Sequence, residues 1–118
     1  ARLLRLRAMR NEVQELLQSP LDSQALRDAL VAKIDGFGMK EASHFLRNIG
    51  RLDLAIIDRH VLKHLFAAGA IDTIPKSMTP KRYRTVEAVF DELAQSWGMT
   101  LQQLDLLFWS LEEGSVRK

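Results

Sequence analysis

Apolar residues recur every three or four positions along most of this chain, which is the spacing of amphipathic α-helices. The spacing predicts about six helices: one from the start of the chain to about residue 19, and five more over about 22–34, 40–48, 58–69, 80–97 and 100–114. No segment shows the sustained alternation of apolar and polar residues that a half-buried strand would need. The pattern therefore predicts an all-α fold.

Residues that favour helix ends stand at several of these boundaries. Thr79 and Pro80 combine a capping hydroxyl with a proline at the first helical position. Thr100 and Gln103 have the spacing of a capping box. Gly114 is expected to end the last helix, because glycine often follows the final helical residue.

The composition is that of a small globular protein. At 118 residues, with 47% hydrophobic and 27% charged residues, the chain is expected to form a single helical domain over 1–118. No apolar run reaches the roughly 18 residues of a membrane span, and no signal peptide is visible, so we expect an intracellular location and no membrane partner. The absence of cysteine excludes disulfides, zinc–thiolate sites and cysteine-bound iron–sulfur clusters.

The overall charge does not by itself indicate a nucleic-acid partner, because 17 basic and 15 acidic residues leave a formal charge of only +2. Basic residues do gather in the first predicted helix, at 81–84 and at the end of the chain. Each cluster is either a basic binding face or simply a solvated helix face.

The stretch from residue 34 to residue 60 combines features that bind phosphate and carry a nucleophile. Gly36 and Gly38 can take backbone angles closed to other residues, and they leave no side chain in the way of a ligand. They precede a helix whose first amides have no internal partner and whose dipole favours an anion. Lys40 lies in that first turn. Asp58 follows 18 positions later, far enough for one helix and one turn to return the chain to the lysine.

The segments GFGMKEAS and LAIIDRHVLKHL resemble the helix-hairpin-helix and Gly/Pro-Asp signature of the DNA glycosylase superfamily. In that superfamily, a lysine after the G-x-G hairpin and an aspartate 18 positions later mark the bifunctional glycosylase/lyases. The segment WSLEEGSVRK is also similar to the tail of the archaeal-type (type 2) 8-oxoguanine DNA glycosylases. The resemblance implies a helix-hairpin-helix over about 22–50, and it implies that the sequence is the C-terminal part of a larger glycosylase.

The resemblance also implies a reaction in base-excision repair. Lys40 would attack C1′ of the damaged nucleotide and form a Schiff base that permits β-elimination of the 3′ phosphate. Asp58 would stabilise the positive charge that builds on the sugar or assist proton transfer. The target nucleotide must leave the duplex. In the relatives a tryptophan and the C-terminal lysine contribute to recognition of 8-oxoguanine, and these residues here are Trp109 and Lys118.

The hairpin itself would hold the DNA backbone, in a contact that does not depend on base sequence. The amides that the resemblance assigns to a phosphate belong to Gly36, Phe37 and Gly38. The carbonyls that it assigns to a monovalent or other hard cation belong to Ala32, Ile34 and Phe37. Asp35 stands where family hairpins often have proline, which makes the local charge less favourable for phosphate. We expect no required cofactor, and a monomer that binds damaged double-stranded DNA.

Other interpretations stay open. The chain could be a glycosylase for an oxidised pyrimidine or an alkylated base, or a non-catalytic helix-hairpin-helix module that binds DNA. It could also be inactive without an N-terminal region. In the simplest structural reading, Lys40 is a surface lysine beside a turn and Asp58 is a helix cap. His60 and His64 are spaced like two metal ligands on one helix, but the sequence points to no third ligand.

Overall fold

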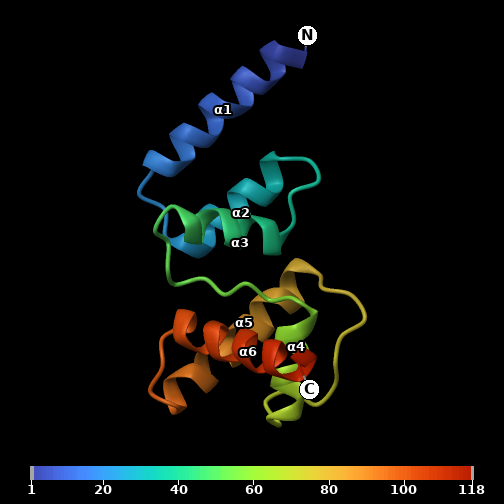
Figure 1. Cartoon of the computed structure of the whole chain (residues 1–118). Coiled ribbons are helices and arrows are strands. Elements are labelled where there is room, and N and C mark those ends of the chain that lie inside the picture. Colours follow the sequence, from blue (N-terminus) through green and yellow to red (C-terminus); the bar gives the residue numbers. More distant parts are fainter. Residues whose placement is uncertain (1, 118) are drawn as a thin grey trace. The chain divides into compact units, whose positions relative to one another are not determined.

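The computed structural model describes residues 2–117, with side chains from residue 10 to residue 112. Six helices span this part of the chain (Figure 1): α1 Arg2–Gln18, α2 Ser23–Lys33, α3 Met39–Asn48, α4 Arg59–Ala67, α5 Pro80–Ser96 and α6 Leu101–Arg117. Residues 2–117 contain no strand, so the predicted all-α fold is confirmed. The predicted end of the last helix was wrong, because α6 continues through Gly114. A glycine inside a helix costs about 1 kcal/mol relative to alanine, which weakens a helix without stopping it.

The predicted starts of α5 and α6 are confirmed by their caps. Thr79 Oγ1 accepts a hydrogen bond from the Arg82 amide at 3.2 Å, and Pro80 is the first residue of α5. Thr100 and Gln103 form a reciprocal capping box, with each side chain accepting from the other residue's amide at 3.1 and 3.0 Å. Both caps are hydrogen bonds between residues three positions apart, so the local sequence is enough to predict them.

The chain divides into two compact units, Ala1–Arg51 with α1 to α3 and Leu52–Lys118 with α4 to α6. In the first unit, α2 contacts both α1 and α3. The fully buried apolar side chains of α2 and α3 are Leu26, Leu30, Ala42 and Leu46. These side chains hold α2 and α3 as the two arms of a hairpin, with residues 34–38 forming its turn.

A polar pair lies inside this otherwise apolar unit. Arg27 of α2 is fully buried, and its Nη1 donates to Ser43 Oγ on α3 at 3.2 Å. Ser43 in turn donates to the carbonyl of Met39 at 2.7 Å. Buried polar groups need such partners, so the pair ties the first turn of α3 to α2.

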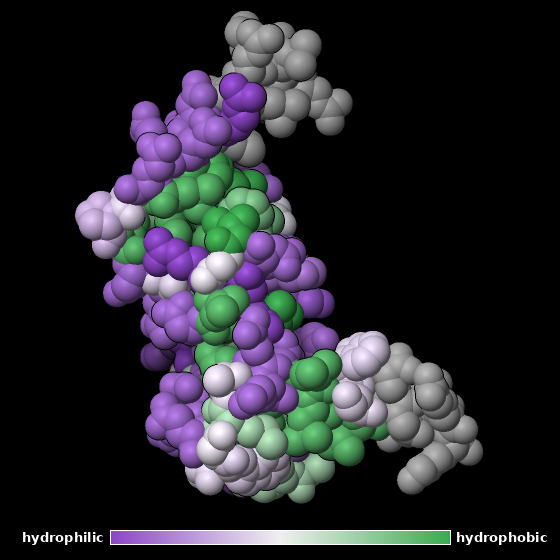
Figure 2. Space-filling model, turned by 60° about the vertical axis from the view of Figure 1, so that its left-hand side comes forward, coloured by the Kyte–Doolittle hydropathy of each residue, from purple (hydrophilic) through white to green (hydrophobic). Residues whose placement is uncertain are grey.

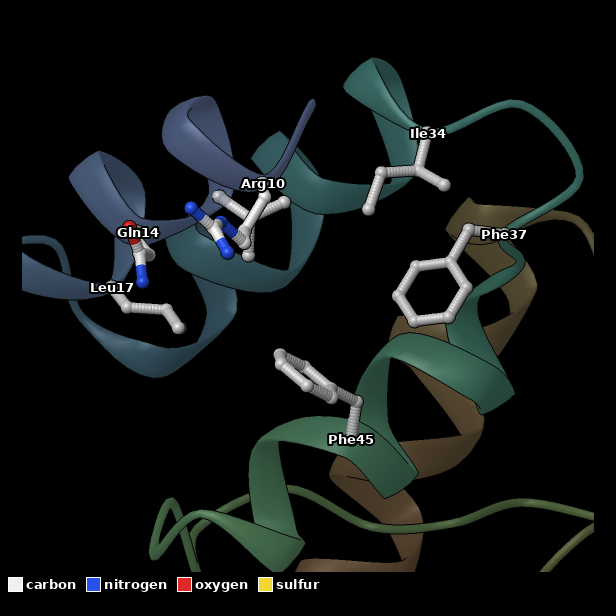
Figure 3. Close-up of a pocket in the computed structure, with 7 residues that line it drawn as sticks. Arg10, Gln14, Leu17, Ile34, Phe37 and Phe45 are labelled. Atoms are coloured by element: carbon white, nitrogen blue, oxygen red, sulfur yellow. The ribbon is translucent and has the colours of Figure 1, made fainter. Parts of the chain in front are cut away.

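An open apolar groove lies between α1 and the α2–α3 hairpin (Figure 3), and its lining residues are Arg10, Val13, Gln14, Leu17, Ile34, Phe37 and Phe45. The rings of Phe37 and Phe45 meet edge to face, with centroids 6.4 Å apart and an interplanar angle of 69°. Phe37, at the hairpin turn, therefore packs against α3.

In the second unit, α6 contacts both α4 and α5. Leu65, Phe90, Leu104 and Phe108 are buried there, and the rings of Phe90 and Phe108 meet edge to face at 5.9 Å. Apolar side chains also reach the surface among hydrophilic ones (Figure 2). Trp109 on α6 is 62% exposed and so is accessible to a ligand.

Candidate functional site

The hairpin turn between α2 and α3 requires glycine at one position. Gly36 has φ +80°, a left-handed conformation that side chains with a Cβ rarely adopt. The Phe37 amide donates back to the carbonyl of Ile34 at 3.1 Å and closes the turn. A carbonyl oxygen has a second lone pair, so this bond leaves Ile34 able to accept another partner.

Gly38 differs from what we expected. Its φ of −90° and ψ of 179° are extended angles open to any residue, so the expectation of a restricted backbone was right for Gly36 and wrong for Gly38. Gly38 is the N-cap of α3, and its amide donates to the carboxylate of Glu41 at 3.1 Å. A Cβ at this position would lie 2.6 Å from that carboxylate oxygen. Glu41 therefore occupies one of the amides that we predicted to bind a phosphate, and that role of Gly38 stays a prediction.

Lys40 is the second residue of α3, and its side chain is exposed. It lies directly after the hairpin turn, in the turn of helix whose amides point away from the helix body. An amine in this position is accessible to a substrate whose phosphate approaches the same amides.

Asp58 is the N-cap of α4. Its Oδ1 accepts a hydrogen bond from the Val61 amide at 2.9 Å, and its side chain is partly buried. Capping uses one carboxylate oxygen and fixes the direction of the other. The residue is therefore a helix cap whose second oxygen remains available for another partner within the part of the chain that the structure describes.

The irregular segment before Asp58 is fixed by two buried side chains of α5. Tyr83 Oη accepts from the Ile57 amide at 2.9 Å and donates to the Ala55 carbonyl at 2.7 Å. Glu87 accepts from the Ala55 amide at 2.8 Å. Tyr83 and Glu87 are 2% and 4% exposed. Because no strand neighbour pairs with this segment, these side chains supply the partners that its buried backbone requires.

A small cavity of about 70 Å³ lies beside Asp58, and its lining residues are Asp58, His60, Val61, Asp105, Phe108, Trp109 and Glu112. The second unit therefore brings together Asp58 and Trp109, for which the family resemblance implied separate roles in catalysis and in base recognition. The proximity of Glu112 to His60 and His64 was missed. Glu112 lies 48 residues from His64, so no local signal could have indicated it.

The remaining site residues lie elsewhere. Gly36, Phe37, Gly38 and Lys40 come together in the first unit, and their approach to Asp58 stays a prediction. Lys118 falls outside the described residues. No group of three or more His, Asp or Glu side chains in the described part of the chain is arranged to hold a metal ion. No helix within that part is long and apolar enough to cross a membrane.

Known proteins resemble this chain in sequence and in fold. A family model described as 8-oxoguanine DNA glycosylase matches residues 1–99. The chain belongs to this family. Curated 8-oxoguanine DNA glycosylase/AP lyases from Methanocaldococcus jannaschii and Korarchaeum cryptofilum are 40% and 41% identical to it over 106 residues, which is 90% of this chain and 51% of each relative. The chain thus spans about half the length of the curated 8-oxoguanine DNA glycosylases it matches.

Solved structures of the family share the fold. The crystal structure of the Methanocaldococcus jannaschii 8-oxoguanine glycosylase/lyase in complex with a 15mer DNA containing 8-oxoguanine is 36% identical, with a TM-score of 0.81 over 94% of this chain and 53% of that one. The Thermotoga maritima 8-oxoguanine DNA glycosylase is 42% identical, with a TM-score of 0.71 over 82% of this chain and 46% of that one. The predicted helix-hairpin-helix glycosylase fold is confirmed.

Proposed function

We propose that this protein removes 8-oxoguanine from damaged double-stranded DNA and then cleaves the resulting abasic site. The observation that carries the proposal is the family match over residues 1–99, a range that includes Lys40 in the first turn of α3 and Asp58 at the N-cap of α4. The relatives with about 40% identity are named as 8-oxoguanine DNA glycosylase/AP lyases. The proposal extends those activities to this chain.

Lys40 is the proposed nucleophile. Its neutral amine attacks C1′ of the deoxyribose as the bond from C1′ to the base breaks, and the base leaves with the bonding electrons and a proton. Opening of the sugar ring gives a Schiff base between Nζ and C1′. Loss of a proton from C2′ then expels the 3′ phosphate, and water releases the enzyme from the sugar fragment. The exposed position of Lys40 supports this role, because the amine must reach a substrate outside the protein.

Asp58 is proposed to stabilise positive charge on the sugar. The cap bond to Val61 holds the carboxylate, and the Tyr83 and Glu87 bonds hold the segment that leads to it. A charge that is already oriented costs no reorganisation when the transition state forms. The flipped base would then lie near the cavity that Asp58 shares with Trp109.

DNA binding is proposed to use the hairpin. The amides of Gly36, Phe37 and Gly38 would approach a phosphate after Glu41 swings away from Gly38. The carbonyls proposed for a monovalent cation are those of Ala32, Ile34 and Phe37. Lys118 is proposed to contact the base. We further propose that the protein acts as a monomer inside the cell, with no other cofactor.

Borohydride trapping tests the nucleophile, the substrate and the reaction together. The protein is mixed with duplexes carrying 8-oxoguanine, an oxidised pyrimidine, an alkylated base or no lesion, and reduction converts any Schiff base to a stable crosslink. We expect crosslinks with the 8-oxoguanine duplex for the unchanged protein and for Lys33→Ala, a matched exposed lysine in the same unit. We expect none for Lys40→Ala.

The alternatives give different results. Crosslinks from Lys40→Ala at the unchanged rate would refute the assigned nucleophile. Crosslinks only with another lesion would correct the substrate. DNA binding without a crosslink to any lesion, including a preformed abasic site, would instead indicate a binding module. The alignment covers about half of each relative's sequence. Supplying the region of a relative that lies outside the alignment, and repeating the assay, would test whether that region is needed for activity.

A further inference from the structure

Glu112 of α6 joins two histidines of α4. Its Oε1 lies 3.0 Å from Nδ1 of His60, and its Oε2 lies 3.2 Å from Nε2 of His64. An ionised carboxylate only accepts hydrogen bonds, so in the hydrogen bond between His64 and Glu112 the donor is Nε2 of the ring. The two histidines are one helical turn apart on α4. Their two contacts with Glu112 therefore restrain both the position of Glu112 along the axis of α4 and its distance from that helix.

A second contact between α4 and α6 lies one helical turn before Glu112. The His64 ring stacks on Phe108 with centroids 5.1 Å apart and an interplanar angle of 20°, so α4 holds α6 at two points one turn apart. Trp109 lies between these points, three residues before Glu112, and residues with that spacing share a helix face. A slip of α6 would therefore move Trp109.

Trp109 depends on this external support. It is 62% exposed, so packing around its own side chain restrains it weakly. It nevertheless lines the cavity that also contains Asp58 and Glu112. The position of Trp109 beside that cavity follows from the position of α6, and Glu112 and Phe108 are the side chains of α6 that contact the two histidines of α4.

We propose that Glu112 is a positioning residue for base recognition: through His60 and His64 it holds Trp109 over the cavity beside Asp58. This inference rests on the proposed glycosylase function. Glu112 acts on the placement of the base and takes no part in the chemistry at C1′. Base excision therefore depends on it, whereas cleavage of a preformed abasic site, which contains no base, does not.

The experiment compares Glu112→Ala and Glu112→Gln with the unchanged protein and with Glu92→Ala, which removes an exposed carboxylate from α5 of the same unit. Single-turnover rates are measured on an 8-oxoguanine duplex and on a duplex with a preformed abasic site. We expect Glu112→Ala to slow excision by about tenfold or more, since small misplacements of a positioned group have effects of this size. Abasic-site cleavage should stay within about twofold.

Glu112→Gln keeps the length of the side chain and can still accept one hydrogen bond, so it should recover part of the excision rate. Glu92→Ala should leave both reactions unchanged. An equal loss in both reactions for Glu112→Ala would overturn the proposal, because it would indicate general damage to the unit. Unchanged excision would also overturn it.

A fluorescence measurement tests the placement of Trp109 without relying on activity. In a Trp97→Phe background, Trp109 is the one remaining tryptophan. We expect Glu112→Ala to lower its steady-state anisotropy while circular dichroism shows unchanged helix content. Unchanged anisotropy would refute the positioning role. If the unchanged protein cleaves neither substrate, the proposed function fails, and the anisotropy result still decides whether Glu112 restrains Trp109.

Discussion

Tyr83→Phe is the sharpest test of how this fold supports Asp58. The substitution removes one oxygen atom and keeps the ring, so it leaves the packing of α5 in place. The lost hydroxyl is the partner of both the Ala55 carbonyl at 2.7 Å and the Ile57 amide at 2.9 Å, in a residue that is 2% exposed. A buried polar group without its partner costs roughly 1–3 kcal/mol, so we expect the two groups together to lower the free energy of unfolding by about 2–4 kcal/mol after local relaxation.

The assay is urea and thermal unfolding followed by circular dichroism. For a unit of this size, each kcal/mol lowers the Tm by roughly 4–8 °C. Thr85→Val is the matched control, because it removes an exposed hydroxyl from the same helix, and it should change stability by less than about 0.5 kcal/mol. Well below the lowered Tm, Tyr83→Phe should also slow excision more than it weakens DNA binding. A loss of stability no larger than that of the control would refute the reasoning about the segment before Asp58.

Three further substitutions separate structural from functional roles. Asp58→Asn keeps a good N-cap, so the free energy of unfolding should change by less than about 0.5 kcal/mol while the excision rate falls. Asp58→Ala should slow excision as well and should also lower the free energy of unfolding in urea by about 1 kcal/mol. A normal excision rate for Asp58→Asn would show that Asp58 is a helix cap alone. Gly36→Ala should lower the free energy of unfolding by about 1 kcal/mol in the same assay, because φ at this position is +80° and no neighbouring atom lies within 4 Å to add a clash. An unchanged stability would contradict the left-handed turn. Glu41→Ala frees the Gly38 amide and removes a negative charge beside it. Fluorescence anisotropy of a labelled undamaged duplex at low salt should therefore show about two- to fivefold tighter binding, which corresponds to the ~0.3–1 kcal/mol of a charge at a helix N-terminus. Unchanged or weaker binding would mean that this amide does not contact the DNA.

The sequence predicted the helices well because their ends are set by short-range chemistry. Thr79 and Thr100 cap their helices through partners three residues away, and Asp58 does the same for α4. The turn at Gly36 follows from the same kind of local restriction. The sequence predicted less well where glycine fits more than one backbone conformation. Gly38 lies in extended backbone, and Gly114 lies inside a helix.

By itself, then, the sequence determined the all-α fold, the hairpin, and the placing of Lys40 and Asp58 at the starts of two helices. Only the tertiary structure decided which side chains support them. Tyr83 reaches Ala55 over 28 residues, and Glu112 reaches His64 over 48. Such contacts form because α4, α5 and α6 pack together and bury polar groups that must find partners, and no spacing along the chain records which partners those will be.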